Sequence, residues 1–86
     1  MAELLSYSSG VSDVPLLGET IGENFERTVA RFGTREALVE AATGRRWTYA
    51  ELDAAVNEVA LGLLARGIKK GDRVGIWSPN CAEWVF

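Results

Sequence analysis

Residues 46–86, RWTYAELDAAVNEVALGLLARGIKKGDRVGIWSPNCAEWVF, decide the fold of this 86-residue chain. In order along the chain they contain a helical pattern, a glycine, a charged turn, a short apolar run and a Pro-Asn turn. This order predicts one α/β unit followed by the start of another. The stretch contains no catalytic motif, so it is more informative about the fold than about the chemistry.

The pattern after Trp47 predicts an amphipathic helix over residues 49–66. Thr48 and Glu51 have the spacing of a capping box, in which a hydroxyl and a carboxylate each accept one backbone N–H at the helix start. Trp47 and Leu52 lie on either side of this box and are placed for a hydrophobic staple. Apolar side chains then recur at helical spacing and form one stripe, Leu52, Val56, Val59, Ala60 and Leu63.

A glycine ends this predicted helix. Gly67 stands at the C′ position, where a left-handed backbone favours glycine. Ile68 is spaced to contact Leu63, as in a Schellman motif. The polar residues that follow predict a surface turn, Lys69, Lys70 and Asp72.

Residues 73–78 are nearly continuous in apolar character over positions 74–77 rather than alternating, which predicts a strand covered on both faces, as in a parallel sheet. Pro79 and Asn80 predict a turn after it, and a helix is expected to begin at Cys81. Little else in the chain can cover this strand. Trp77 is therefore expected to be partly exposed here.

The first third of the chain adds an arm and a second helix. Residues 1–18 are rich in Ser, Gly and Pro and have little periodicity, so we expect an extended N-terminal arm. Residues 19–86 then form the folded part. Thr20 and Glu23 repeat the capping-box spacing and predict a helix near residues 21–32.

A β-hairpin is predicted between the two helices. Residues 37–39 are apolar, residues 41–45 contain a Thr-Gly turn signal, and residues 46–48 lead back. Trp47 is the expected apolar anchor of this hairpin. The fold class is therefore α/β, with the element order helix, β-hairpin, helix, strand and start of a helix.

Composition limits the class of protein. At 48% apolar and 24% charged residues the chain is globular, and its length allows one small domain of marginal stability. The net charge of −3, without a clustered basic face, argues against a nucleic-acid partner. No apolar run approaches the ~20 residues of a membrane helix. The first ten residues lack the features of a signal peptide or presequence, which predicts a cytoplasmic protein.

No residue of the chain is assigned a catalytic, cofactor-binding or metal-binding role. Gly62 and Gly67 have P-loop spacing, but Ile68 follows where that loop requires Lys, and no dinucleotide-binding glycine motif follows the predicted strand. Cys81 is the sole cysteine and the chain has no His to activate it. Carboxylates on the helices are interpreted as caps and solvated faces, namely Glu51, Glu58 and Glu83.

With these residues laid out, the chain resembles the beginning of the AMP-forming acyl-CoA synthetases, members of the adenylate-forming superfamily that includes firefly luciferase and peptide-synthetase adenylation domains. The resemblance is carried by WTYAELDAAVNEVALGLLARGIKKGDRVGIWSPNCAEW, residues 47–84. The earlier stretch SYSSGVSDVPLLGETIGENFERTVARFGTREALV, residues 6–39, is similar to medium-chain fatty acid–CoA ligases of the acyl-CoA synthetase family member 2 type and their bacterial relatives.

The resemblance implies a two-step reaction for a full-length family member. ATP and a carboxylic acid give an acyl-adenylate and pyrophosphate, and coenzyme A then displaces AMP to form a thioester. Magnesium offsets the phosphate charge. The family's phosphate-gripping loop, its acyl and nucleotide pockets and its catalytic lysine lie downstream of residues 1–86, so no residue role is carried over and no cofactor is expected on this segment.

Two hypotheses of function follow. In the first, the chain is an N-terminal fragment of a fatty acid–CoA ligase, truncated within the large adenylation domain and inactive alone, whose partner is the rest of that domain. In the alternative, it is a freestanding α/β interaction module without catalysis. A polypeptide that continues into a Ser/Thr/Gly-rich loop with Lys favours the first, and a stably folded 86-residue monomer favours the second. A third option, the start of an unrelated α/β enzyme, requires residues 48–84 to match by chance.

Overall fold

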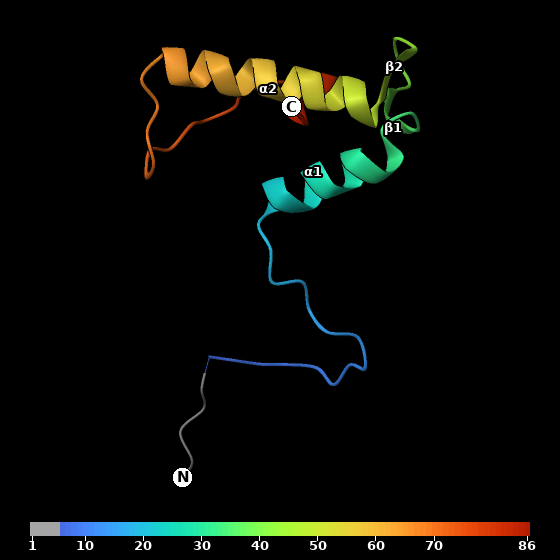
Figure 1. Cartoon of the computed structure of the whole chain (residues 1–86). Coiled ribbons are helices and arrows are strands. Elements are labelled where there is room, and N and C mark those ends of the chain that lie inside the picture. Colours follow the sequence, from blue (N-terminus) through green and yellow to red (C-terminus); the bar gives the residue numbers. More distant parts are fainter. Residues whose placement is uncertain (1–5) are drawn as a thin grey trace.

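The structure, a computed structural model, describes residues 6–86. The described part contains α1 (Ile21–Phe32), β1 (Glu36–Glu40), β2 (Arg45–Thr48), α2 (Tyr49–Ala65) and a short 3₁₀ turn, η1 (Ala82–Trp84). The predicted order of helix, hairpin and helix is confirmed. Figure 1 shows α1 beside the first part of α2, with the hairpin at the end where the two helices meet.

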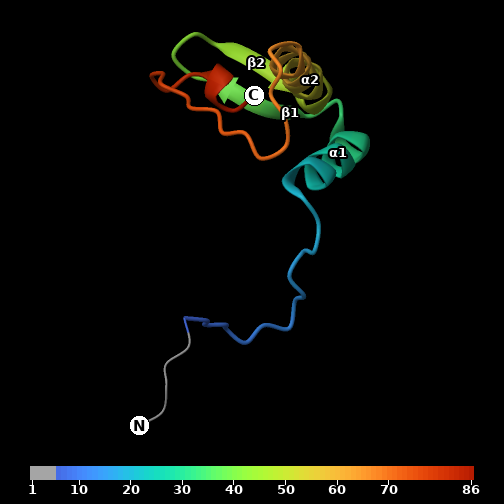
Figure 2. The same cartoon turned by 90° about the vertical axis from the view of Figure 1, so that its left-hand side faces the viewer.

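The segment before α1 extends away from the other elements. Residues 6–20 form neither helix nor strand, and both views show them as a trace leading away from α1 (Figures 1 and 2). The expected arm over residues 1–18 also includes residues 1–5, which lie outside the described residues. The division of the chain at residue 18 stays a prediction.

A complete capping box starts α1. The Thr20 hydroxyl accepts the N–H of Glu23 at 3.1 Å, and the Glu23 carboxylate accepts the N–H of Thr20 at 3.2 Å. Because both bonds are local, the sequence spacing predicted them correctly. The helix contacts α2 through a stripe that is only half-buried, and Ile21 at its start is exposed.

The start of α2 is capped by the connection between α1 and β1 as well as by its own N-cap. Thr48 accepts from the third residue of the helix, but the reciprocal carboxylate bond of the predicted box does not form. Carbonyls of the connection satisfy the first two amides instead. The three bonds are Tyr49 N–H to the Arg35 carbonyl (2.9 Å), Ala50 N–H to the Gly33 carbonyl (3.0 Å) and Glu51 N–H to the Thr48 hydroxyl (3.2 Å).

The end of α2 is a Schellman motif, as predicted. Gly67 has φ of 84°, in the left-handed region, and its N–H donates to the Leu64 carbonyl at 3.0 Å. The N–H of Ile68 donates to the Leu63 carbonyl at 3.1 Å. These bonds satisfy carbonyls that the last helical turn otherwise leaves without a donor.

The two strands form an antiparallel hairpin in which Leu38 lies opposite Trp47 and Glu40 lies opposite Arg45. The register shifts between Glu36 and Leu38, so one residue of β1 is extra. The hairpin confirms the predicted strand–turn–strand and its apolar anchor. It packs against α2, which contacts both strands.

The predicted strand over residues 73–78 is wrong for this structure. These residues belong to no helix or ladder, and Figure 1 shows them as a loop that returns from the far end of α2. Trp77 is fully exposed at 104%, which is more than the partial exposure expected from the sequence. Val74 and Ile76 are more than half exposed. A strand is defined by hydrogen bonds to a neighbouring strand. The sheet of the described residues consists of β1 and β2, and residues 73–78 do not pair with either of them.

The helix expected from Cys81 is also wrong. Residues 82–84 form a single 3₁₀ turn, and Cys81 rather than Asn80 precedes it as the cap. The first amide of this turn, that of Ala82, donates its N–H to the Glu40 carboxylate in β1. A contact with the hairpin therefore determines this turn, and helical propensity does not.

The described residues bury very little. Leu52 and Ala82 are the apolar side chains that are buried, at 6% and 3% exposure. The accessible surface is 8044 Å², whereas a compact protein of this size exposes about 5,000 Å². The radius of gyration is 17.8 Å, against about 12 Å for a compact chain of this length. Among the described residues, no helix has both the length and the apolar character needed to cross a bilayer.

Candidate functional site

The most developed polar site joins the hairpin to residues 81–86, a segment that we call the strap. Glu40 and Arg45 face each other across the hairpin, with Arg45 Nη2 2.7 Å and Nε 3.1 Å from the two Glu40 carboxylate oxygens. The same guanidinium binds Glu83 of η1 at 2.8 and 3.2 Å. We call these three residues the ion cluster.

Glu40 is the residue on which the other groups of this site converge. Its carboxylate also accepts the N–H of Ala82 at 2.7 Å and the hydroxyl of Thr43 in the hairpin turn. Its side chain is 12% exposed, whereas those of Arg45 and Glu83 are 45% and 55% exposed. A partly buried carboxylate with this many donors stays charged, because each donor favours the ionised form.

The ion cluster changes the acidity of its members. The Arg45 guanidinium, then the Thr43 hydroxyl and the Ala82 N–H, lower the pKa of Glu40 to about 2. Arg45 likewise lowers the pKa of Glu83 to about 2. The two carboxylates, Glu83 first, raise the pKa of Arg45 above its ordinary range. Carboxylates held ionised in this way cannot donate a proton near neutral pH, so the cluster is a structural site and has no suitable general acid.

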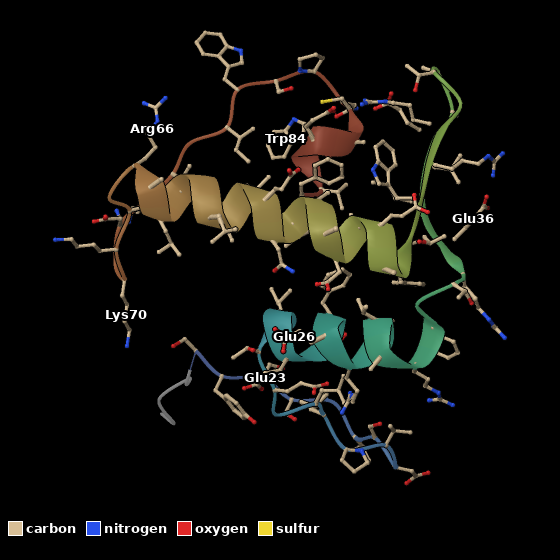
Figure 3. All side chains as sticks on the ribbon, turned by 45° about the horizontal axis from the view of Figure 1, so that its top comes forward. Glu23, Glu26, Glu36, Arg66, Lys70 and Trp84 are labelled. Atoms are coloured by element: carbon tan, nitrogen blue, oxygen red, sulfur yellow. The ribbon has the colours of Figure 1, made fainter. Side chains whose placement is uncertain are left out.

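An aromatic pair lies next to the ion cluster. The rings of Trp47 and Phe86 meet edge to face, with centroids 5.4 Å apart and planes at 76°. The Arg45 guanidinium lies over the Trp47 ring at 5.1 Å. Trp84 donates its indole N–H to the Ser78 carbonyl at 2.9 Å, and Figure 3 shows it on the strap beside α2. Aromatic packing and an ion pair therefore hold the strap against the hairpin.

An apolar groove of about 280 Å³ lies between the strap and the two helices. No charged side chain lines it. A site of this composition can accept apolar groups but has no polar side chain to orient a reacting ligand. Its lining residues, which define the apolar groove, are Ile21, Gly22, Phe25, Leu52, Val56, Val85 and Phe86.

A metal ion needs a cluster of ligating side chains, and a phosphate group is often bound by free amides at a helix start. Over residues 6–86, no group of three or more His, Cys, Asp and Glu side chains is placed to hold a metal. The first three amides of α2 are already bonded to the Arg35 and Gly33 carbonyls and to the Thr48 hydroxyl, so the start of this helix offers none of them to a phosphate. The expectation that this segment binds no cofactor stays a prediction.

Cys81 lies beside the Ser78 hydroxyl and the Glu83 carboxylate, and the chain has no His to activate the thiol. Its sulfur lies 3.4 Å from the Ser78 hydroxyl, and a hydroxyl is not a base for a thiol. The two acidic residues Glu51 and Glu58 lie exposed on α2, as expected. Glu83 differs from expectation, because it binds Arg45 and does not serve only as a solvated cap.

Sequence reasoning missed the ion cluster. The available signal was the position of Glu40 and Arg45 at the two ends of the hairpin turn, where opposite charges face each other in an antiparallel pair. The addition of Glu83 had no sequence signal, since it depends on the strap folding back onto β1. Figure 3 shows Glu36 on the hairpin and Arg66 and Lys70 at the opposite end of α2.

Comparison with known proteins identifies the family. The family described as AMP-binding enzyme matches residues 25–86. This chain belongs to the AMP-binding enzyme family. No solved structure matches the chain of this AMP-binding family member. Its helix, hairpin and helix are the first elements of an α/β AMP-binding domain, which confirms the fold class expected from the sequence.

Curated relatives of this AMP-binding family member carry acyl-CoA ligase names. It is 46% identical over 81 residues to "Medium-chain acyl-CoA ligase ACSF2, mitochondrial" of Danio rerio, which covers 94% of this chain and 13% of that protein. It is 44% identical over 82 residues to the protein of the same name from Rattus norvegicus, with coverages of 95% and 13%. It is 43% identical over 83 residues to "Acyl-CoA ligase sidI" of Aspergillus fumigatus, with coverages of 96% and 14%.

The resemblance to acyl-CoA ligases stated from the sequence is therefore confirmed. The chain spans only 13–14% of the length of these relatives. The word mitochondrial belongs to the names of two of them, and the cytoplasmic location expected for this chain stays a prediction.

Proposed function

We propose that this chain supplies the first elements of the large adenylation domain of an acyl-CoA ligase. The observation that carries the proposal is identity of 43–46% to proteins named acyl-CoA ligases across nearly the whole chain. On this proposal the complete enzyme activates a fatty acid with ATP and transfers the acyl group from the acyl-adenylate to coenzyme A, with magnesium on the phosphates. A medium-chain acid is the proposed substrate because two of the relatives are named for it.

The second half of α2 supports a place inside a larger domain. Residues 59–65, VALGLLA, are apolar on every side of the helix, and all seven are exposed. Leu61 and Leu64 are 66% and 67% exposed. A helix that is apolar all round is typically buried on all sides. Several neighbouring elements must cover this stretch, which favours the adenylation domain over a freestanding module that binds a partner on one face.

The chain alone is proposed to be inactive. Over residues 6–86 no cluster of side chains is placed to hold a metal ion, and positioning and charge neutralisation of phosphate are most of what such a site supplies. The test is pyrophosphate release by the purified 86-residue chain with ATP, magnesium and a medium-chain fatty acid. We expect no turnover above buffer, and turnover that follows the protein through purification contradicts this proposal.

A chimera tests the proposed role directly. This chain replaces the matching 81-residue segment of the Danio rerio relative, and acyl-CoA formation is measured. We expect the chimera to retain activity, while the same relative without the segment loses it. A matched control carries Leu61→Lys and Leu64→Lys, which place charges on the surface that the rest of the domain is proposed to cover. Activity that is equal in the control chimera, or absent from a folded unmodified chimera, counts against the proposal.

A further inference from the structure

The polar contacts between the strap and the hairpin are centred on Glu40 and Arg45. Glu40 accepts the Ala82 N–H directly and, through Arg45, is linked to Glu83 of the same strap. The first attachment needs the negative charge of Glu40 itself, and the second uses an Arg45 side chain that Glu40 holds in position. Charge-assisted hydrogen bonds of this kind are about twice as strong as neutral ones.

The strap covers apolar groups that the hairpin and α2 present. Ala82 is buried against β1, and Phe86 lies edge-on to Trp47. Val85 and Phe86 form one wall of the apolar groove, whose other walls come from α1 and α2. Figure 2 shows the strap lying along the hairpin beside β1. A detached strap leaves Leu52 and the rest of the groove open on that side.

We propose that Glu40 is the positioning residue of a releasable strap, so that loss of its negative charge detaches residues 81–86 from the hairpin and opens the apolar groove. The proposal concerns a conformational device and does not depend on the proposed function. Arg45 is the charged group that contacts Glu40 from β2, and Glu83 is the charged group that approaches from η1. Thr43 contributes an uncharged hydroxyl from the turn.

Amide hydrogen exchange of the strap in the 86-residue chain tests the proposal. The Trp84 and Val85 amides are bonded within the strap, to the carbonyls of Cys81 and Ala82, and report its order. Glu40→Gln keeps the size of the side chain and removes its charge. We expect exchange of the strap amides to accelerate on the order of fivefold, the effect of weakening one charge-assisted contact at a partly exposed site.

Glu36→Gln is the matched control. Glu36 lies in the same strand and pairs with Arg46 at 2.8 Å, but it does not contact the strap. This variant changes net charge equally, so we expect its strap amides to exchange at the wild-type rate. Equal acceleration in both variants, or no acceleration in Glu40→Gln, overturns the proposal.

A second variant covers the case in which Glu40→Gln disturbs the hairpin itself. The Gly44 amide, which donates to the Glu40 carbonyl at 2.8 Å, reports hairpin order. Glu83→Gln lies outside the hairpin on a side chain that is 55% exposed, and it breaks only the second attachment. We expect faster exchange in the strap and unchanged exchange at Gly44. Unchanged strap exchange in Glu83→Gln overturns the proposal even when Glu40→Gln unfolds the hairpin.

Discussion

Arg45 shows how one side chain connects parts of the chain that are far apart in sequence. Its guanidinium makes paired contacts with Glu40 and with Glu83, and its face lies over Trp47. The planar fork of arginine suits two carboxylates at once, which lysine cannot reproduce. At the residue scale, the side-chain contacts between distant segments lie near the hairpin turn. The Asp72 carboxylate, by contrast, accepts the backbone N–H of Lys69 within its own turn.

The order of the strap should depend on acid pH. The pKa values of Glu40 and Glu83 are lowered to about 2, so both carboxylates are ionised at neutral pH, and Arg45 stays positive throughout. A carboxyl group whose pKa is lower in the folded state stabilises that state at every pH above the group's ordinary pKa. This stabilisation is lost as the pH falls from the ordinary pKa toward the folded-state pKa. We expect the strap to loosen between about pH 4.5 and 2.

The measurement is the pH dependence of the strap's exposure to a protease, or of tryptophan emission. Salt should weaken the same contacts, because Arg45 and Glu83 are partly exposed and therefore screened. In the Glu36→Gln variant, the order of the strap should depend on pH as it does in the wild type. A strap that stays ordered at pH 2 in low salt contradicts the prediction.

Thr20→Ala should destabilise α1 by roughly 0.5–2 kcal/mol, because it leaves the Glu23 amide without its acceptor and opens the capping box. Circular dichroism and exchange at the first turn of α1 measure the loss. Thr34→Ala, in the turn after α1, is the control and should have little effect. Equal losses from both substitutions indicate that the box contributes nothing specific.

At the scale of elements, α2 has two different halves. Its first half is capped by the α1–β1 connection, contacts the hairpin and α1, and contains the buried Leu52. The second half is exposed on all sides from Val59 to Ala65. The helix keeps its length because Schellman bonds and good helix formers support the exposed half locally. Tertiary contacts stabilise only the first half.

Leu52→Ala should cost roughly 2–3 kcal/mol, toward the low end for a buried leucine, because the surrounding groove is open and can relax. Leu61→Ala, on the same helix but 66% exposed, should change stability by less than about 0.5 kcal/mol. Urea unfolding followed by circular dichroism compares the two. A similar cost at both positions argues against the core described here.

Residues 73–78 should become a strand only when another strand lies beside them, a prediction that rests on the proposed function. In the 86-residue chain their amides have no ladder partner and should exchange at close to the rate of an unfolded peptide. In the chimera with the Danio rerio relative the same amides should be strongly protected. Equal exchange in both proteins refutes the prediction.

At the scale of the whole molecule, the chain exposes more surface than a compact protein of its size, and many large apolar side chains lie on that surface. Its accessible surface exceeds that of a compact protein of the same size by about 3,000 Å². The extended residues before α1 account for part of the excess, and the second half of α2 and residues 73–77 account for another part. A standard interface buries about 800 Å² on each partner, so covering this surface requires an extensive contact.

The 86-residue chain alone should therefore self-associate at micromolar concentration. Large exposed apolar patches are interaction or aggregation sites, and Trp77, Leu61 and Leu64 lie on them. Sedimentation velocity and dye binding measure association, and tryptophan emission measures exposure. Leu61→Lys with Leu64→Lys should reduce association, whereas Ser8→Lys with Ser9→Lys in the arm should not. A wild-type monomer that binds no dye and unfolds cooperatively contradicts this prediction and favours the freestanding module.

The sequence by itself determined the elements whose bonds are local. Both helices, their Thr caps, the Gly67 ending and the hairpin follow from interactions between residues a few positions apart, which spacing reveals. Membership in the AMP-binding enzyme family could also be predicted from the sequence, because the motif spacings extend along most of the chain.

Only the tertiary structure decided how distant segments meet. The ion cluster, the caps that the α1–β1 connection provides for α2, and the 3₁₀ turn at Ala82 depend on contacts between residues brought together by folding. The apolar run at residues 73–78 resembles a strand in sequence, yet it has no ladder here, because strand formation needs a neighbour and apolar character alone does not provide one.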